Sequence, residues 1–302
     1  MLLVISEIVE QVIYGIMAGG IYAMIGAGLS MIFGVMRFSN FAHGEFYMLG
    51  AYITYIISIA SGLDPYLTAP LAAMAVGLLG ILINISIIKP LYEAVGKARR
   101  ASVIYFQDLN FILLTVGLSI FFVDLALIIW GPIPLRVPTV LSDINLSIGF
   151  IKFGFQRLIA LVVACISLGA FYLFLKKTKI GKAIRAVSQN PTAAMLTGIN
   201  IYKIYNITIF VSLFLAALAG GILSPVFNLY PRMGLDIVVK AFVVVILGGL
   251  GNIVGSIYAG FLLGIMENLG GLFLGTQYRE TIGFVMMILV LWLKPKGLFG
   301  KG

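Results

Sequence analysis

Long apolar stretches separated by short polar segments run through the whole chain. Residues 12–36, 66–88 and 241–266, for example, contain no charged side chain. About 20 consecutive apolar residues are enough for a helix to cross a hydrocarbon core about 30 Å thick. The pattern therefore predicts nine membrane passes, at residues 8–36, 44–61, 66–88, 109–130, 157–175, 205–224, 237–250, 252–272 and 281–293.

Two places depart from this regular pattern. The pass at 237–250 would be about 21 Å long at 1.5 Å per residue, which is too short to cross unaided, and it ends in a glycine-rich segment. Residues 37–44 form a polar interruption between two apolar runs. Such breaks are tolerated at membrane depth only where protein or water satisfies the freed backbone groups. Both breaks are therefore candidates for lining or gating a passage.

Composition agrees with a membrane class. Hydrophobic residues make up 61% of the 302 positions and charged residues only 10%. A soluble core of this size could not cover so much apolar surface. We expect an all-α polytopic membrane protein, a bundle of about 8–10 transmembrane helices with short or broken members, built as a single domain over residues 1–302.

Basic residues are spread along the chain between the apolar spans. The chain has 20 Lys and Arg against 11 Asp and Glu, a formal net charge of +9. This spread argues against a nucleic-acid partner and fixes orientation instead, because cytoplasmic linkers carry an excess of Lys and Arg. With nine passes, the N-terminus is expected outside and the C-terminus inside. The inner side then holds most of the basic residues, at Arg37, 89–100, 176–203 and 294–301.

No catalytic constellation is found in the sequence. His43 is the only histidine, so a metal site with two histidines is not possible. A phosphate-binding loop is also missing, since the two Gly-Lys pairs at 96–97 and 181–182 continue with alanine. We expect no enzyme, no metal and no cofactor on this chain, and any ATP and Mg must be bound by another subunit.

A few polar residues fall within or beside apolar spans. Asp124 and Glu267 lie inside predicted passes, where a charge at the bilayer centre costs about 2.5–3.5 kcal/mol on insertion scales. Either each acid forms an ion pair in the packing, or it lies on a solute path. The asparagines can contact a zwitterionic solute or cap helix ends. The candidate path or gate residues are Asn40, His43, Glu45, Asp124, Gly248, Asn252, Glu267 and Asn268.

The longest polar linker, about 176–204, has an ordered pattern. Residues 181–188 favour a short helix. Asn190 suits an N-cap with Pro191 at the first helical position, and Gly198 suits a helix stop.

Ala193, Ala194 and Leu196 are expected to expose a small, partly apolar knob on the inner face. Such a knob fits a groove on a soluble partner. The alternative is a helix lying on lipid headgroups, where alanine and glycine bury little area. The predicted docking residues are Gln189, Asn190, Pro191, Thr192, Ala193, Ala194 and Gly198.

Residues 27–51, AGLSMIFGVMRFSNFAHGEFYMLGA, closely resemble the signature of branched-chain amino acid ABC transporter permeases, specifically the smaller permease type of that system. The loop at 181–200 is similar to the cytoplasmic loop of the family, and KPKGLFG at 294–300 is similar to its C-terminal ending. The loop also resembles the importer pattern Glu-Ala-Ala-x-x-x-Gly. Thr192 stands where glutamate is usual, which removes any salt bridge that the glutamate would form.

The resemblance implies an assembly. It implies a prokaryotic cytoplasmic-membrane permease that pairs with a second, related permease or with its own copy. Two ATP-binding subunits dock on the inner loops, and an extracytoplasmic binding protein delivers leucine, isoleucine or valine. ATP-driven alternating access moves the solute along the interface between the permeases. Near relatives carry urea, short amides or other amino acids, so the resemblance leaves the solute open.

Three other function classes remain as alternatives. An ion-coupled secondary transporter would show a charged relay in mid-span, whereas this chain has two off-centre acids. A membrane-embedded enzyme would need a paired catalytic set, and a passive channel would conduct without partners.

Overall fold

The computed structural model describes residues 2–98, 107–142, 144–148 and 151–300. Each of the nine predicted passes coincides with a helix in these ranges. Residues 99–100 and 301, which count toward the basic inner side, lie outside them. The long helices are α1 (Leu2–Met36), α2 (His43–Ser61), α3 (Pro65–Ile83), α5 (Gln107–Trp130), α6 (Phe155–Lys177), α9 (Ile201–Leu223), α10 (Met233–Gly248), α11 (Ile253–Leu274) and α12 (Arg279–Leu293).

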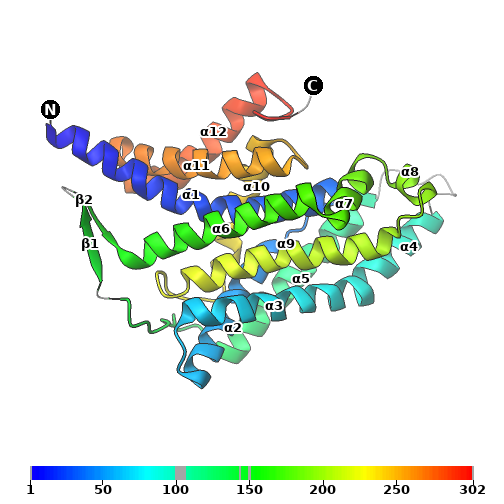
Figure 1. The fold of residues 1–302 in the computed structure, drawn as a ribbon, viewed down its shortest axis with the longest axis horizontal. Coiled ribbons are helices and arrows are strands. Elements are labelled where there is room, and N and C mark those ends of the chain that lie inside the picture. The colour runs from blue at the N-terminus through cyan, green and yellow to red at the C-terminus, as the bar shows by residue number, and fades with distance from the viewer. Residues whose placement is uncertain (1, 99–106, 143, 149–150, 301–302) are drawn as a thin grey trace.

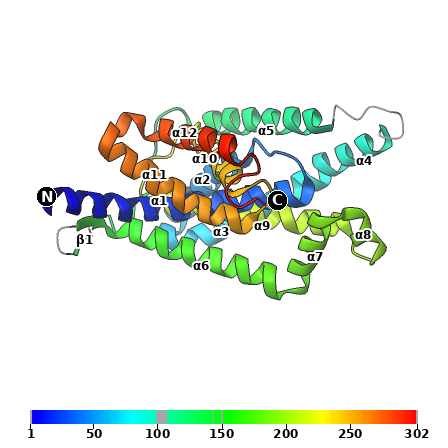
Figure 2. The same cartoon turned by 90° about the horizontal axis from the view of Figure 1, so that it is seen from above.

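The protein is an all-α polytopic membrane protein. Six helical segments of the described chain are long and apolar enough to cross a bilayer: those in α1, α5, α6, α9 and α11, and one that begins with α3 and continues through a π-helical turn, η1 (Asn84–Ile88), into α4 (Lys89–Ala98). In Figure 1, α1, α3, α6, α9 and α11 run along the long axis of the molecule. Figure 2 shows α5 and α6 on opposite sides of the bundle.

Glycines hold α1 against α11 at backbone distance. A Cβ built on Gly15 would lie 2.6 Å from the Cα of Ile265, and one built on Gly264 would lie 2.6 Å from the Cα of Gly19. Apolar burial drives little helix association in lipid, so close van der Waals contact between small residues takes its place. The glycine pairs at four-residue spacing are explained here by helix packing.

Both predicted breaks are present, and the first one leads the chain into the bundle. The chain leaves α1 at Met36 and turns at Arg37, whose φ of 55° is rare for a residue with a side chain. It then enters α2 inside the bundle, where the first turn of α2 meets the first turn of α10. A Cβ on Gly44 would lie 2.0 Å from the Gly234 carbonyl oxygen, so only glycine fits this contact.

A short hairpin precedes α6, and the apolar pattern did not predict it. β1 (Asn145–Ile148) pairs antiparallel with β2 (Ile151–Gly154). Beside it, Leu135 and Leu229 exchange backbone hydrogen bonds of 2.9 and 2.8 Å. The segment before the hairpin is thereby tied to the loop between α9 and α10, near the end of the bundle that holds the N-terminus (Figure 1).

The polar linker after α6 folds into two short helices, α7 (Lys179–Gln189) and α8 (Pro191–Leu196). They lie at the end of the molecule opposite the N-terminus, near α4 (Figure 1). A single turn of 3-10 helix, η3 (Thr276–Tyr278), connects α11 to α12.

Candidate functional site

A cavity of about 520 Å³ opens between α1, α6, α10, α11 and α12, in the half of the bundle that holds the N-terminus. The short helix α10 forms much of its wall, because its first two turns carry Met233, Asp236, Ile237 and Lys240. The remaining wall comes from the following residues: Tyr14, Met17, Ala18, Ile21, Tyr22, Tyr47, Arg157, Ala160, Leu223, Val226, Phe227, Asn228, Tyr230, Asn268, Arg279 and Glu280.

Charges of both signs face this cavity. Arg157, Lys240 and Arg279 supply cationic groups, and Asp236 and Glu280 supply carboxylates. The Arg279 Nε is buried and has no hydrogen-bond partner in the part of the chain that the structure describes. A buried donor without a partner costs free energy, so the guanidinium of Arg279, which lines the cavity, has hydrogen-bonding capacity that the described residues do not use.

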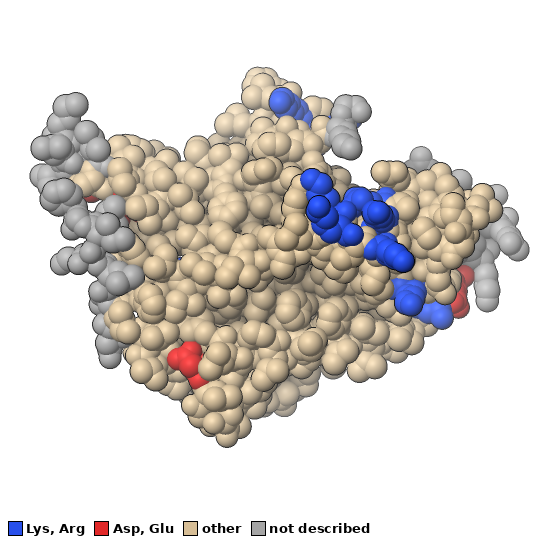
Figure 3. Space-filling view, viewed as in Figure 1, with Lys and Arg blue, Asp and Glu red and all other residues tan. Residues whose placement is uncertain are grey.

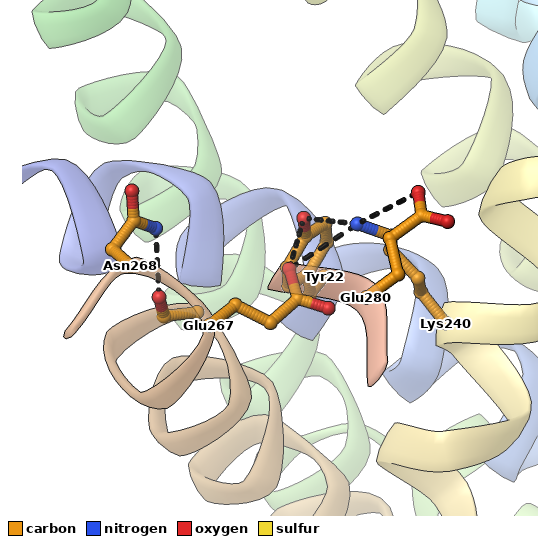
Figure 4. A network of polar contacts seen from close by, with 6 residues as sticks. Tyr22, Lys240, Glu267, Asn268 and Glu280 are labelled. Carbon is orange, nitrogen blue, oxygen red and sulfur yellow. Dashed lines mark hydrogen bonds and ion pairs between the residues drawn. The ribbon is translucent and has the colours of Figure 1, made fainter. Parts of the chain in front are cut away.

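One side of the cavity is closed by a charged network that joins three helices (Figure 4). Lys240 Nζ on α10 donates to Glu267 Oε2 on α11 at 3.2 Å and to Tyr22 Oη on α1 at 3.0 Å. Tyr22 Oη donates in turn to the same carboxylate at 2.9 Å. Glu280 Oε1 lies 3.9 Å from the ammonium and is mostly exposed. Lys240 therefore lies between a buried and an exposed carboxylate.

The hydroxyl of Tyr230 lies in the loop before α10 and donates to Asp236 Oδ2 at 2.5 Å. Burial, followed by this hydrogen bond to Asp236, raises the pKa of Tyr230 to about 12. The hydroxyl therefore stays protonated at neutral pH and holds the Asp236 carboxylate in place.

Part of the cavity lining is apolar. Met17 and Ile21 from α1 lie with Ala160 from α6 and Leu223 from α9. A cavity with charged groups of both signs and an apolar wall matches a small solute that is a zwitterion at one end and aliphatic at the other.

The predicted path residues separate into distinct environments. Asn268 lines the cavity, and Glu267 joins it through Lys240 and Tyr22. Asn252 instead caps α11, where its side chain accepts from Gly255 N at 3.1 Å, and its amide donates to the Phe299 carbonyl. Asn40 accepts from Ala42 N at 3.1 Å just before α2. For Asn252 the structure gives the capping alternative, whereas Asn40 stabilises the turn before α2 and does not cap the helix.

His43 and Glu45 lie where α2 begins, beside the cavity residue Tyr47, and neither is exposed. The His43 Nε2 lies 3.2 Å from the Ile25 carbonyl, and Glu45 Oε1 accepts from Ser119 Oγ on α5 at 2.9 Å. Glu45 Oε2 is buried and has no partner among the described residues. The first turn of α2 thus closes the bundle next to the cavity.

The two other predicted path residues lie away from the cavity. Gly248 ends α10, where a Cβ would meet the backbone of Ser256 at 2.5 Å, so it serves the break between α10 and α11. Asp124 lies on the exposed side of α5. Sequence position alone could not separate Asp124 from Glu267, since each is the single acid of its predicted pass.

The predicted docking segment folds as expected at its caps. Asn190 Oδ1 accepts from Ala193 N at 3.0 Å, Pro191 opens α8, and Gly198 takes a left-handed φ of 83° after the helix. Exposed Lys and Arg side chains gather over the adjoining end of α6 and over α7 (Figure 3).

The surface of α8 differs from the prediction in one residue. Ala194 was expected on the outside, but only 4% of it is exposed, because the helix packs on α7 and α9 along that side. The exposed apolar surface is carried by Met195 and Leu196, which are 54% and 86% exposed. Gln189, Thr192 and Ala193 are exposed, as expected.

Sequence reasoning missed most of the residues that form the cavity. Lys240 and Arg279 were counted only among the basic residues of the outer side, and Tyr22 and Asp236 were not singled out. One signal was available: Lys240 and Glu267 are each a lone charge within an apolar stretch, and charges in such stretches usually pair with each other.

Comparison with known proteins adds the family. The family model described as "Branched-chain amino acid transport system / permease component" matches residues 11–291. The chain belongs to this family. The high-affinity branched-chain amino acid transport system permease protein LivH of Escherichia coli (strain K12) is 28% identical over 302 residues, with 97% of this chain and 95% of the relative covered.

Two further relatives of the family cover similar lengths. The permease protein BraD of Pseudomonas aeruginosa, from a system of the same description, is 29% identical, with 98% of this chain and 97% of the relative covered. The probable branched-chain amino acid transport permease protein LivH of Methanocaldococcus jannaschii is 27% identical, with 99% and 95% covered. No solved structure matches the chain significantly. Membership of the family makes the chain a multi-pass membrane permease.

Proposed function

We propose that the chain is the permease subunit of an ATP-binding-cassette importer that moves leucine, isoleucine or valine across the prokaryotic cytoplasmic membrane. The observation that carries this proposal is a cavity with both charges and an apolar wall in a chain of the branched-chain amino acid permease family. Urea and short amides carry no charge at neutral pH and would leave the charged residues of the cavity without a counterpart.

The cavity residues can be assigned to the two ends of an amino acid. The guanidinium groups of Arg279 and Arg157, which both line the cavity, are the donors for the α-carboxylate. Asp236 and Glu280 are the acceptors for the α-ammonium. The aliphatic side chain then lies against Met17 and Ile21.

The contact between the first turns of α2 and α10 serves as the gate beneath this cavity. The backbones of Gly44 and Gly234 are in contact, and the carboxylate of Glu45 lies against Gly234. A solute leaving the cavity toward the other side must part these two helices. Alternating access is then a separation of α2 from α10 coupled to closure around Tyr14 and Arg279.

ATP supplies the work from outside the chain. Two ATP-binding subunits, which hold ATP and Mg, dock on α7 and α8, with contacts from Gln189, Thr192, Ala193, Met195 and Leu196. The polar cap residue Asn190, Pro191 and Gly198 fix the shape of this knob, and Ala194 anchors it from beneath. Since α7 packs on α1 and α9, movement of the knob reaches the bundle.

The complete importer contains a second, related permease and an extracytoplasmic binding protein that delivers the solute to the cavity. In this arrangement the N-terminus and the cavity lie on the outer side, and α7, α8 and the C-terminus lie on the inner side. The strongest support is the basic side chains that gather near α7, in line with the excess of Lys and Arg in cytoplasmic linkers (Figure 3).

Uptake by cells lacking only this chain tests the proposal. Restoring the chain should restore uptake of labelled leucine, and unlabelled isoleucine and valine should compete with it. Uptake of urea or an amide, with no competition by leucine, would show that the solute is a different one. It would not contradict the proposal that the chain belongs to an importer. Uptake that persists without ATP but needs an ion gradient would contradict the importer itself.

A further inference from the structure

The side of α5 that faces away from the bundle carries an unexplained charge. Asp124 lies in the membrane-crossing segment Leu109–Trp130, six residues before its end, or about 9 Å at 1.5 Å per residue. Its carboxylate is exposed, and among the described residues no hydrogen bond or ion pair reaches it. A carboxylate at this depth is costly against lipid and is normally found facing protein or water.

The same face carries a glycine that the chain itself does not need. Gly117 is exposed, and a Cβ built on it would have no neighbour within 4 Å. Elsewhere in this fold, glycines on helix faces admit another backbone, as Gly15 and Gly19 do against α11. Gly117 and Asp124 are seven residues apart, so they lie on one stripe of the helix.

The stripe has the spacing of a helix–helix seam. Leu113, Gly117, Ile120, Asp124 and Ile128 follow at intervals of three or four residues, and the three apolar members are 67%, 58% and 81% exposed. The opposite stripe of α5, with Thr115, Ser119 and Phe122, is buried against the bundle. One face of α5 is therefore buried within this chain, and the other face is exposed.

We propose that this face of α5 packs against a transmembrane helix of a second, non-identical membrane subunit, which presents a hydrogen-bond donor or cation to Asp124 and approaches closely at Gly117. The proposal rests on the proposed function, because it locates the contact with the partner permease. If a copy of the same chain packed its own α5 on this face across a two-fold axis, one Asp124 would approach the other, and two like charges in lipid repel. Charge complementarity therefore favours a different chain.

The exposed face of α6 supports no such inference. It contains Gly169 and Cys165, but among the described residues on that face no acid lies within the span. Small residues alone are compatible with lipid.

Photo-crosslinking in native membranes tests the contact in the assembled complex. A benzoylphenylalanine replaces Ile120 on the seam or, as a control, Leu78 on α3, which is 53% exposed. We expect a protein adduct from position 120 that mass spectrometry identifies as a different membrane subunit, and lipid adducts alone from position 78. Lipid adducts alone at 120, an adduct with a second copy of this chain, or the same protein adduct at both positions would overturn the proposal.

Co-purification in mild detergent measures the contribution of the two key residues. Gly117→Leu and Asp124→Leu should each reduce the amount of partner recovered by roughly three- to tenfold, the range expected for one membrane contact. Asp124→Asn should keep most of it, since the amide still accepts a hydrogen bond, and Gly169→Leu should change nothing. Each variant is first shown to be monodisperse, and full recovery with Gly117→Leu and Asp124→Leu would contradict the seam.

Leucine uptake separates this inference from the proposed function. If the cells take up another solute, the crosslink at position 120 is still expected. If leucine uptake is found and position 120 reaches only lipid, the inference fails alone.

Discussion

Lys240 on α10 and Glu267 on α11 form an ion pair in which Nζ and Oε2 are 3.2 Å apart and 2% of the carboxylate side chain is exposed. Tyr22 on α1 completes the contact, so three helices meet at one carboxylate. This contact is the inner wall of the cavity proposed to receive the solute. It explains why a lone acid can be kept within an apolar span.

Removing one partner of this pair should harm the fold more than removing both. Lys240→Met leaves the Glu267 carboxylate buried without a cation, a change that costs about 3–5 kcal/mol for buried pairs. The double variant Lys240→Met, Glu267→Leu removes both charges and should recover much of the loss. Thermal unfolding in detergent measures the difference, and equal stability of the single and double variants would contradict a coupled pair.

Glycine at position 44 should be essential for packing. Gly44→Ala adds a Cβ only 2.0 Å from the carbonyl oxygen of Gly234, which is far closer than two such atoms can approach. The helices α2 and α10 must therefore separate. We expect a loss of about 1–3 kcal/mol or more, as for overpacking in cores. Gly169→Ala is the matched control, since nothing lies within 4 Å of its Cβ. A Gly44→Ala protein as stable as this control would disprove the contact that forms the proposed gate.

Arg279 should be needed for transport but not for insertion. Arg279→Gln replaces the guanidinium assigned to the solute carboxylate with a shorter, neutral amide. Hydrogen bonds to charged groups contribute about 1.5–3 kcal/mol, so losing the charge-assisted bond should lower the uptake rate at saturating leucine roughly tenfold or more. Arg136→Gln removes an exposed guanidinium outside this cavity and serves as the control. The concentration for half-maximal uptake should change little, because the binding protein captures the solute. An unchanged rate for Arg279→Gln would remove this residue from the path.

The knob on α8 should tolerate small changes but not a large charge. Ala193 is exposed beside the helix cap, so Ala193→Arg should leave membrane insertion intact and abolish co-purification of the ATP-binding subunits. Gln277→Arg is the control, because Gln277 is exposed and follows the C-terminal end of α11, away from α8. Co-purification and leucine-stimulated ATPase activity that are equal in both variants would count against docking on α8.

The sequence was sufficient to predict the nine long helices, because the apolar run and the polar ends of each are local features of the sequence. The helix α4 was not predicted. The break after α10 and the caps at Asn190 and Gly198 were predicted for the same reason: turn and cap residues act on their own neighbours. Ala194 was placed on the wrong side, because whether a small residue in a short helix is buried depends on how α8 leans on α7 and α9.

The cavity was not predictable in the same way. Lys240, Glu267 and Tyr22 are far apart in the sequence, and only helix packing brings the lysine and the tyrosine to the Glu267 carboxylate. A single sequence likewise gave no reason to prefer Glu267, which is paired inside the bundle, to Asp124, which lies on its outside.

The most direct test of the central claim is ATP-dependent uptake of labelled leucine by vesicles that contain the whole assembly, with and without this chain. The account predicts uptake that requires both ATP and this chain, that isoleucine and valine inhibit, and that Arg279→Gln reduces. Leucine uptake at the full rate in vesicles lacking the chain, or uptake by the chain without ATP, would contradict it.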